Sequence, residues 1–523
     1  MRTTREAQNT GDNTNGSFLY GTADEYIAGT PAQFSITEVN NHKIGDTLAD
    51  LGMYAETDWK ARQNLTVSYG FRYETQNHLG DHHDIAPRVA FNYGLFSGKG
   101  APKTVLRGGF GMFYTRFAQA NVLTLEADNG TNETIYTVDN PGAGCTPGTA
   151  TAGGGTAAAN LIAACNATPQ TQTTYSAATN LRTPYIVQFA VGADQAVGKH
   201  GTLSVNYLHS QGDHQFASQN VGYNFASPSA STPTYQYFSE GGFKQNQLII
   251  NGRVQTGKAI SLFGFYSLNS ANGDTSGPGS FPSVPGDLKA DYGRTTFDVK
   301  SRLFIGGSIT LPKLIQFSPF MIAQSGNPYN ITTGSDNNLD TIFNDRPYLE
   351  ASGYTSPTPV AAGQVSPVQS IAGCGTFAQP GSQSAGAKLV PINYCTGPAL
   401  FTFNFRLTKT IGFGKSTAVK AENGQGGPPP GGMPPGGGRG GPPGGGGGGR
   451  GGPGFGGGGA NSGKRYNVAF GVQVQNLFNN EDLATPQGDL ASSEFGKSTQ
   501  LTGGPYTTTN ALRRISLQAS FQF

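Results

Sequence analysis

The sequence predicts an all-β protein that crosses a membrane as an antiparallel β-barrel. Three observations predict this fold class. Charged residues make up 13% of the 523 residues, about half of the ~25% usual in soluble domains, while Phe, Trp and Tyr make up 11%. No apolar run reaches the ~18 residues of a spanning helix. Polar and apolar residues also alternate along many short segments. A chain without spanning helices crosses lipid only as a closed barrel, so these observations together favour a barrel.

The alternation has the period of two that a strand with one lipid-facing side requires. Within 64–76, the odd positions from Leu65 to Tyr73 are apolar or aromatic, and the even positions from Thr66 to Glu74 are small, polar or charged. The segments 399–413, 464–477 and 511–523 repeat this pattern. Charges fall on the polar side, where they avoid the cost of about 2–4 kcal/mol for Arg or Lys at the bilayer midplane.

Applied along the chain, this criterion predicts about fourteen strands. They lie near residues 14–20, 48–59, 64–76, 85–96, 103–117, 184–196, 201–212, 245–257, 259–270, 297–311, 315–325, 399–413, 464–477 and 511–523.

The connections between these strands alternate between short and long. Outer-membrane barrels have short periplasmic turns and long extracellular loops, and this alternation is typical of them. The long connections are 21–47, 118–183, 213–244, 271–296, 326–398 and 478–510. Two connections break the rule: 78–84 is short and 414–463 is long. A soluble β-sandwich also has alternating strands, but its loops need not segregate by length and its outer faces are normally charged. We therefore favour the barrel.

Several sequence blocks resemble a known family. Residues 54–60 (YAETDWK), 64–67 (NLTV) and 70–74 (GFRYE) resemble the "QDDW…NLTLNLGLRYE" signature of TonB-dependent receptor barrels. Further matching blocks, in the same order, are 86–91, 105–114, 330–334, 344–347, 476–479 and 513–515. Together they resemble the Oar-like branch of these receptors.

The resemblance implies a barrel of 22 strands in the outer membrane of a Gram-negative bacterium, with a plug domain and a TonB box. We recognise no signal peptide, regulatory-like domain, TonB box or plug in the sequence. We therefore expect residues 1–523 to form one barrel domain that supplies about fourteen of the strands, as the C-terminal part of a receptor. The resemblance also suggests that a terminal Phe signals to the barrel-assembly machinery, here Phe523 together with Phe521.

The four cysteines occur as two pairs within two long connections, Cys145 with Cys165 and Cys374 with Cys395. Disulfides persist in oxidising compartments such as the cell surface. Metal ligation is the alternative, but no His or further Cys lies at close spacing. We predict two loop disulfides.

One loop carries oxygen ligands at spacings that resemble a calcium loop: Asp336, Asn338, Asp340 and, further on, Asp345. It departs from the EF-hand, because Thr341 replaces the Gly of the sharp turn and a proline stands where the bidentate Glu belongs. The alternative is an Asx-rich solvated turn, and both interpretations stay open. For residues 81–84 (DHHD) we prefer a polar strand connection to a transition-metal site.

Residues 414–463 are dominated by Gly and Pro. Such a segment cannot bury a core, and we predict a disordered periplasmic insertion. The sequence shows neither a nucleophile elbow nor a phosphate-binding loop, so we predict that the protein is not an enzyme. Its net charge of +2 suggests no nucleic-acid partner.

The combined interpretation is a TonB-dependent, Oar-like receptor that imports a bulky nutrient such as a saccharide, a peptide or a metal chelate. The resemblance implies three partners besides outer-membrane lipid: the assembly machinery, the TonB complex acting through the plug, and an extracellular ligand. We expect no cofactor apart from the calcium alternative at 336–345. Two other classes of function stay open: a surface adhesion or structural protein, and a passive porin.

Overall fold

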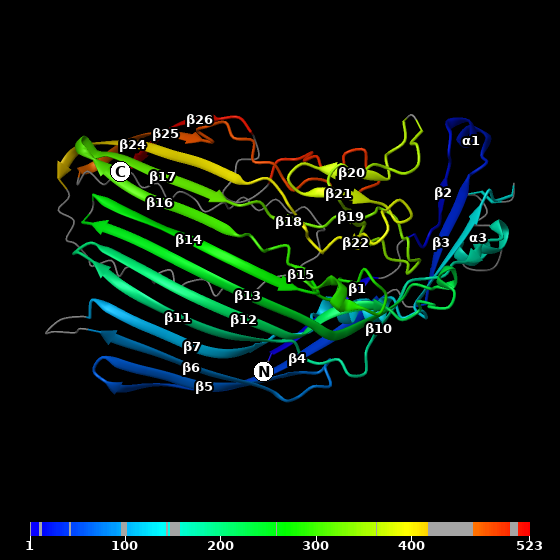
Figure 1. Cartoon of the computed structure of the whole chain (residues 1–523), viewed down its shortest axis with the longest axis horizontal. Coiled ribbons are helices and arrows are strands. Elements are labelled where there is room, and N and C mark those ends of the chain that lie inside the picture. The colour runs from blue at the N-terminus through cyan, green and yellow to red at the C-terminus, as the bar shows by residue number, and fades with distance from the viewer. Residues whose placement is uncertain are drawn as a thin grey trace.

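A computed structural model describes residues 2–9, 13–40, 43–95, 102–142, 145–146, 157–257, 259–361, 363–416, 464–502 and 511–522. Its main feature is a 16-stranded sheet, in which β10 and β15 lie off a continuous path of antiparallel neighbours. We call this path the wall (Figure 1). In spatial order its strands are β1 (Arg2–Asn9), β4 (Lys43–Arg62), β5 (Leu65–Gln76), β6 (Asp84–Leu95), β7 (Thr104–Tyr114), β11 (Tyr185–Val197), β12 (Gly201–Asn220), β13 (Thr234–Thr256), β14 (Ile260–Gly273), β16 (Ser301–Leu311), β17 (Ile315–Gln324), β24 (Leu400–Ser416), β25 (Lys464–Gln475) and β26 (Arg514–Gln522).

The predicted all-β, antiparallel fold is confirmed, and every wall strand except β1 lies where the alternation places it. A strand does lie within the first predicted range, 14–20, but its place in the wall is wrong: Ser17–Leu19 forms β2 of a separate small sheet, and the first wall strand is β1. The sequence of β1, RTTREAQN, has no apolar alternation. It pairs with Lys43–Asp50, the half of β4 that extends away from the strongly apolar part of the wall, so no lipid-facing side chains mark it.

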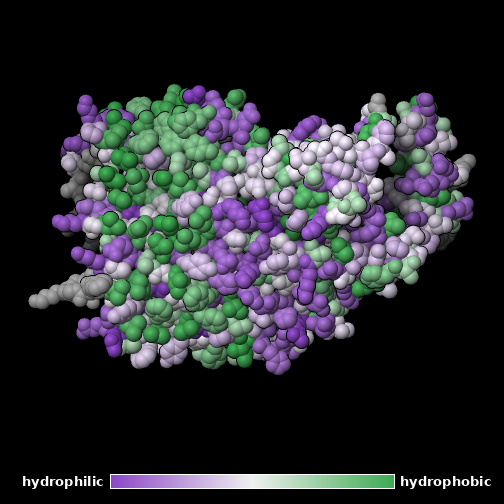
Figure 2. Space-filling model, viewed as in Figure 1, coloured by the Kyte–Doolittle hydropathy of each residue, from purple (hydrophilic) through white to green (hydrophobic). Residues whose placement is uncertain are grey.

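The outer face of the wall carries the apolar positions that the alternation predicts. Trp59 is 58% exposed and Phe71 is 55% exposed, although both are large and apolar. Figure 2 shows the hydrophobic surface gathered over the left half of the strands and the hydrophilic surface to its right. An exposed apolar band of this kind is what lipid contact requires. Other members of the band are Val89, Phe91, Phe110, Phe189, Val205, Ile305, Ile411, Phe470, Leu517 and Phe521.

The connections differ at the two ends of the wall. At one end, the short-turn end, strands are joined by tight links such as 198–200 and η4 (Pro312–Leu314). At the other, the long-loop end, the connections hold most of the remaining elements (Figure 1). These are β2 (Ser17–Leu19), α1 (Ala23–Ala28), β3 (Gln33–Val39), α2 (Gln119–Ala127), β8 (Glu133–Asp139), α3 (Ala157–Cys165), β9 (Thr168–Pro169), β10 (Thr174–Ala177), η2 (Pro228–Ala230), η3 (Leu288–Asp291), β15 (Gly293–Arg294), β18 (Pro328–Tyr329), β19 (Tyr348–Glu350), β20 (Val368–Ile371), β21 (Gly375–Ala378), β22 (Lys388–Leu389) and β23 (Cys395–Thr396).

One long connection is shorter than predicted. Residues 213–244 were expected to be a loop, but β12 continues to Asn220 and β13 begins at Thr234. The pairing passes through irregularities at Gly212/Gln215 and Gln215/Ala217, where His214 adopts a positive φ of 56°. Such bulges interrupt the period of two, and for this reason the alternation ends before the strands do.

The wall is an open sheet. Among the described residues, β1 pairs along one edge with β4, β26 pairs along one edge with β25, and neither pairs with the other. No helix in the described part of the chain is long and apolar enough to span a membrane. Most of the predicted Gly/Pro-rich insertion, residues 417–463, and Phe523 lie outside the described residues, so these predictions stay as they were.

Candidate functional site: the inner wall and the loop layer

The inner face of the wall carries the polar positions of the alternation, and several of their charges form ion pairs. Arg107 on β7 pairs with Asp194 on β11. Arg72 pairs with Glu74 on the same strand at 2.5 Å, since residues two apart in a strand point to the same face. Ser204 donates to Asp194 at 2.6 Å. The inner face is therefore hydrophilic between β5 and β12, as the interior of a membrane barrel is.

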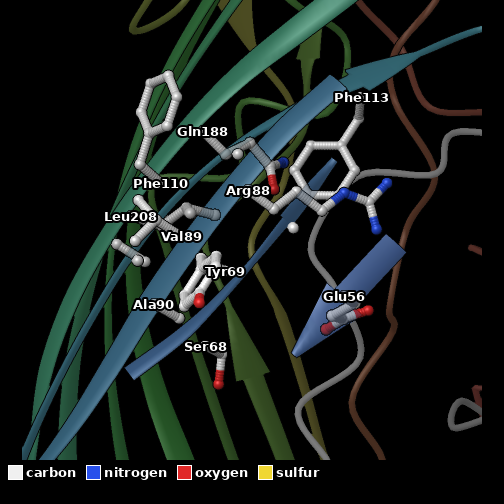
Figure 3. Close-up of a pocket in the computed structure, with 14 residues that line it drawn as sticks. Glu56, Ser68, Tyr69, Arg88, Val89, Ala90, Phe110, Phe113, Gln188 and Leu208 are labelled. Carbon is white, nitrogen blue, oxygen red and sulfur yellow. The ribbon is translucent and has the colours of Figure 1, made fainter. Parts of the chain in front are cut away.

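A cavity of about 290 Å³ lies in the wall between β4 and β12. Arg88 places its guanidinium 4.6 Å from the centre of the Phe113 ring, a cation–π contact. Figure 3 shows these two side chains on one side of the cavity, with Glu56 of β4 on the same side. Gly70 leaves room for the neighbouring strand, because a Cβ atom there would lie 2.5 Å from the carbonyl oxygen of Ala55. A ligand or protein that enters the cavity can therefore contact one cation (Arg88), one carboxylate (Glu56) and one aromatic ring (Phe113).

The connection 115–184 sends α2 onto the inner face of the wall. The buried amide of Gln119 donates from Nε2 to the carbonyl oxygens of Asp46, at 2.9 Å, and of Thr4, at 3.2 Å. Arg116, just before the helix, pairs with Asp50 at 3.1 Å and lies 3.9 Å from Glu74. These contacts hold the start of α2 to β1, β4 and β5.

The same segment also contacts β12 and β13, which lie further along the wall than β5, β6, β7 and β11. Phe117 is 1% exposed, and its ring centre lies 5.2 Å from that of Phe216 on β12 and 5.6 Å from that of Tyr237 on β13. Its backbone N–H donates to Gln76 of β5 at 3.2 Å. Residues 116–119 therefore connect β4 and β5 with β12 and β13 near the long-loop end. This segment is not predicted from the sequence, because a nine-residue helix preceded by a buried Phe has no distinctive pattern.

At the long-loop end, the connections 221–233, 274–300, 325–399 and 476–513 pack together into what we call the loop layer. One of its hydrophobic clusters joins Ile331, Phe377, Val390 and Leu490, all 0% exposed, from two of these connections. A buried ion pair joins Arg346 to Asp291 at 2.6 Å. The layer is thus a packed structure with its own core.

Arg346 uses every part of its guanidinium. Its Nη2 donates to the carbonyl oxygen of Ala290 at 2.8 Å as well as to Asp291. Its Nη1 donates to the carbonyl oxygen of Val390 at 2.5 Å, and its Nε donates to the hydroxyl of Ser283 at 3.0 Å. Asp291 in turn accepts from the backbone N–H of Ser283 at 2.7 Å. Burial lowers the pKa of Arg346, while the carboxylate of Asp291 opposes this shift. This network joins 274–300 to 325–399.

The predicted calcium residues form a hydrogen-bonded turn in the loop layer. Asp336 accepts from the backbone N–H groups of Asp340, at 3.0 Å, and Thr341, at 2.8 Å. Asp345 accepts from the side chain of Asn338 at 2.8 Å. Such bonds are those of an Asx-rich turn. In the described part of the chain, no three His, Cys, Asp or Glu residues are grouped to hold a metal ion. Calcium binding here stays a prediction.

Burial affects the carboxyl groups of this turn. It raises the pKa of Asp340 to about 6, with Asp336 and Asp345 acting in the same direction and the backbone N–H of Ile342 acting against it. The pKa of Asp345 is also raised, chiefly by burial. The turn therefore contains two carboxyl groups, those of Asp340 and Asp345, whose ionisation is unfavourable because they are buried.

The structure places the cysteines in the predicted pairs. Cys145 and Cys165 are bonded, with 4.5 Å between their Cα atoms, beside the cluster around Phe34 and Ile36. Cys374 and Cys395 are bonded, with 5.4 Å between their Cα atoms. Cys395 belongs to the core of the loop layer.

Of the two predicted assembly residues, Phe521 lies on β26, 54% exposed. Its ring stacks near Tyr466, at 6.1 Å between ring centres, and near Phe413, at 6.2 Å. Three aromatic rings from β24, β25 and β26 thus share one face close to the chain end. A role of Phe521 in assembly stays a prediction.

An open antiparallel wall with an apolar outer face, a charged inner face and one end rich in loops defines the membrane β-barrel class. The chain belongs to the family described as "Outer membrane beta barrel domain", whose model matches residues 78–422. Its location is accordingly the outer membrane. No curated protein matches the chain.

Many solved structures are similar to it, and three serve as examples. The outer membrane transporter YddB from Escherichia coli has 12% identity and a TM-score of 0.47, over 97% of this chain and 48% of that one. The pyoverdine receptor FpvA from Pseudomonas aeruginosa, bound to pyoverdine, has 9% identity and a TM-score of 0.43, over 95% and 44%. A mutant of the ferric enterobactin receptor PfeA from the same organism has 10% identity and a TM-score of 0.42, over 94% and 49%. The chain spans about half the length of these structures.

Proposed function

We propose that the chain is the barrel part of a TonB-dependent, Oar-like receptor that imports a bulky nutrient. The observation that carries the proposal is the open wall: β1 and β26 end the path without pairing with each other in the described residues. Backbone groups on an open edge have no partner in hydrocarbon, at a cost of several kcal/mol each. Further strands must therefore complete the barrel, which is wider than a fourteen-stranded one.

A wide barrel needs a plug to keep the membrane sealed, and we propose that a plug domain outside these 523 residues docks on the inner wall. The groups on the inner face of the wall support this proposal, because a docking domain could pair with them. They are the Arg88–Phe113 pair and Glu56 at the cavity, and the Arg107–Asp194 pair nearby. The plug would in turn contact TonB, and the receptor would act as a transporter rather than as an enzyme.

The adhesion alternative has one observation in its favour. The sheet of β2, β3, β8 and β9 lies apart from the wall and is tied by the Cys145–Cys165 disulfide (Figure 1). The neighbouring α1 exposes Tyr26 and Ile27, at 69% and 81%. A module of this kind could bind a partner without transporting anything.

A pair of measurements tests the proposal. Outer membranes from cells that produce the full gene product are incubated with the purified periplasmic domain of TonB, and membranes from the deletion strain serve as the control. The receptor proposal expects specific TonB capture. In planar bilayers, residues 1–523 alone should give no stable single-channel conductance, because an exposed edge pairs wrongly or aggregates. A discrete channel formed by this chain, together with no capture of TonB, would reject the receptor proposal in favour of a passive porin.

A further inference from the structure

A second cavity, of about 250 Å³, lies in the loop layer, away from the inner-wall cavity. It is enclosed by three connections that are distant in sequence, together with the end of β12. The residues that line it are Gln219, Asn220, Val221, Tyr223, Phe225, Phe281, Pro282, Pro285, Gly286, Asp340 and Ile342. Its size suits one ring-sized group of a larger ligand, since pockets for whole small molecules begin at about 300 Å³.

Aromatic side chains form much of this lining, and they are held in fixed orientations. Tyr223 and Phe225 meet edge to face, with ring centres 4.7 Å apart and planes at 85°. The hydroxyl of Tyr223 donates to the carbonyl oxygen of Asn338 at 3.3 Å. Phe281 is fixed by a similar contact with Tyr235, at 4.7 Å. Phe225 is nevertheless 73% exposed, so a large apolar surface stays accessible beside the cavity.

The polar part of the lining is neutral or acidic. Asp340 is 3% exposed and Gln219 lies next to the cavity with an amide that donates to Gln236 at 3.2 Å. No Lys, Arg or His belongs to the lining. Arg and Lys are the side chains that recognise phosphate and carboxylate, so the cavity is poorly suited to an anionic ligand. Its carboxyl and amide groups can instead pair with hydroxyl groups.

The cavity is also preformed. Asn220 joins two of its walls, because its side-chain nitrogen donates to the carbonyl oxygen of Asp340 at 2.7 Å, and its side-chain oxygen accepts from the N–H of Gly222 at 2.9 Å. The Asp291–Arg346 pair fixes the connection that carries Phe281 to the one that carries Asp340. A preformed site loses little conformational entropy when a ligand binds.

We propose that this cavity binds a sugar ring of a neutral oligosaccharide. A pyranose ring has an apolar C–H face that can pack on Phe225 and Tyr223, and an edge of hydroxyl groups that can pair with Gln219 and Asp340. The inference rests on the proposed function, because it names the class of nutrient that the receptor would capture first at its loops. A cationic peptide is the rival ligand, since it also suits aromatic rings beside a carboxylate.

The test uses outer-membrane vesicles from cells that produce the full gene product. Fluorescein-labelled cellohexaose, xylohexaose and maltohexaose are the probes, with hexalysine as the cationic competitor and vesicles from the deletion strain as background. The variants are Phe225→Ala and the nearly isosteric Asp340→Asn. Phe343→Ala is the matched control, because Phe343 is 71% exposed in the same layer but does not line the cavity.

We expect at least one hexasaccharide to bind above background, with an affinity that falls about tenfold in Phe225→Ala and severalfold in Asp340→Asn, and by less than about twofold in Phe343→Ala. Hexalysine should not displace it. The inference is overturned if no hexasaccharide binds, if Phe225→Ala and Phe343→Ala behave alike, or if hexalysine competes. This binding does not require TonB, so TonB capture without saccharide binding would reject the inference and leave the receptor proposal standing.

Discussion

Replacing Arg346 with Ala should loosen the loop layer while leaving the wall intact. The substitution removes the cationic partner of Asp291, which is only 3% exposed, so little solvent is available to compensate its charge. It also leaves the carbonyl oxygens of Ala290 and Val390 without their side-chain donors. Breaking one side of a buried ion pair costs about 3–5 kcal/mol. Since about 1.4 kcal/mol is a factor of ten, this corresponds to a rise of roughly two to three and a half orders of magnitude in local opening.

Hydrogen exchange of the outer-membrane protein, followed by mass spectrometry, measures this opening. The informative amides are those of Ser283, which donates to Asp291, and Val390, which donates to Pro347. Lys497→Ala is the control, because its pair with Glu494 is exposed and worth under about 1 kcal/mol.

Combining Arg346→Met with Asp291→Leu should restore much of the protection at Val390, because an apolar pair leaves no buried charge. The amide of Ser283 is not a readout in this variant, because Asp291→Leu removes its acceptor. Exchange at Ser283 and Val390 that stays within about fivefold of wild type in Arg346→Ala would refute the reasoning.

Three further predictions concern orientation, pH and the disulfide of the loop layer. On intact cells, a membrane-impermeant maleimide should label Ser229→Cys, which is exposed in the connection 221–233, and not Lys199→Cys in the turn 198–200; the reverse pattern would invert the topology. Burial raises the pKa of Asp340 from 3.8 to about 6. Between these values the native state keeps a proton that the unfolded chain releases. The free energy of unfolding should therefore fall by at most about 3 kcal/mol as the pH rises from ~4 to ~6. Protection measured by hydrogen exchange should lose this dependence in Asp340→Asn, and an unchanged pH profile would assign it to another group. Replacing both Cys374 and Cys395 with Ser opens a link across a sequence separation of 21 and should cost the loop layer about 3 kcal/mol; native-state proteolysis that cuts 325–399 no faster than in wild type would contradict this.

Sequence reasoning located the lipid-crossing parts of the wall because lipid constrains them directly. In β5, the positions from Leu65 to Tyr73 must be apolar on one face, and this requirement is local in sequence. β1 was misplaced because it pairs with the half of β4 near the long-loop end, where neither face needs lipid-facing side chains. The same holds for the ends of β12 and β13, whose bulge at His214 interrupts the period of two.

The candidate sites depended on contacts between segments far apart in the chain. The cysteine pairs were predicted because each lies within one connection, 20 and 21 residues apart. The position of Gln119 against Asp46, by contrast, joins residues 73 apart, and the Asn220–Asp340 contact joins residues 120 apart. No periodicity or spacing marks such pairs.

By itself, the sequence determined that the chain is an antiparallel membrane sheet, which residues face lipid and where most strands lie, because the period of a strand and the hydrophobicity of the bilayer act on each segment independently. Only the tertiary structure decided that the wall begins at β1 and not at residues 14–20, that α2 lies on its inner face, and that three connections enclose a cavity beside Phe225. These features arise from hydrogen bonds and burial that distant segments supply to one another, and the local pattern of residues does not encode which segments will meet.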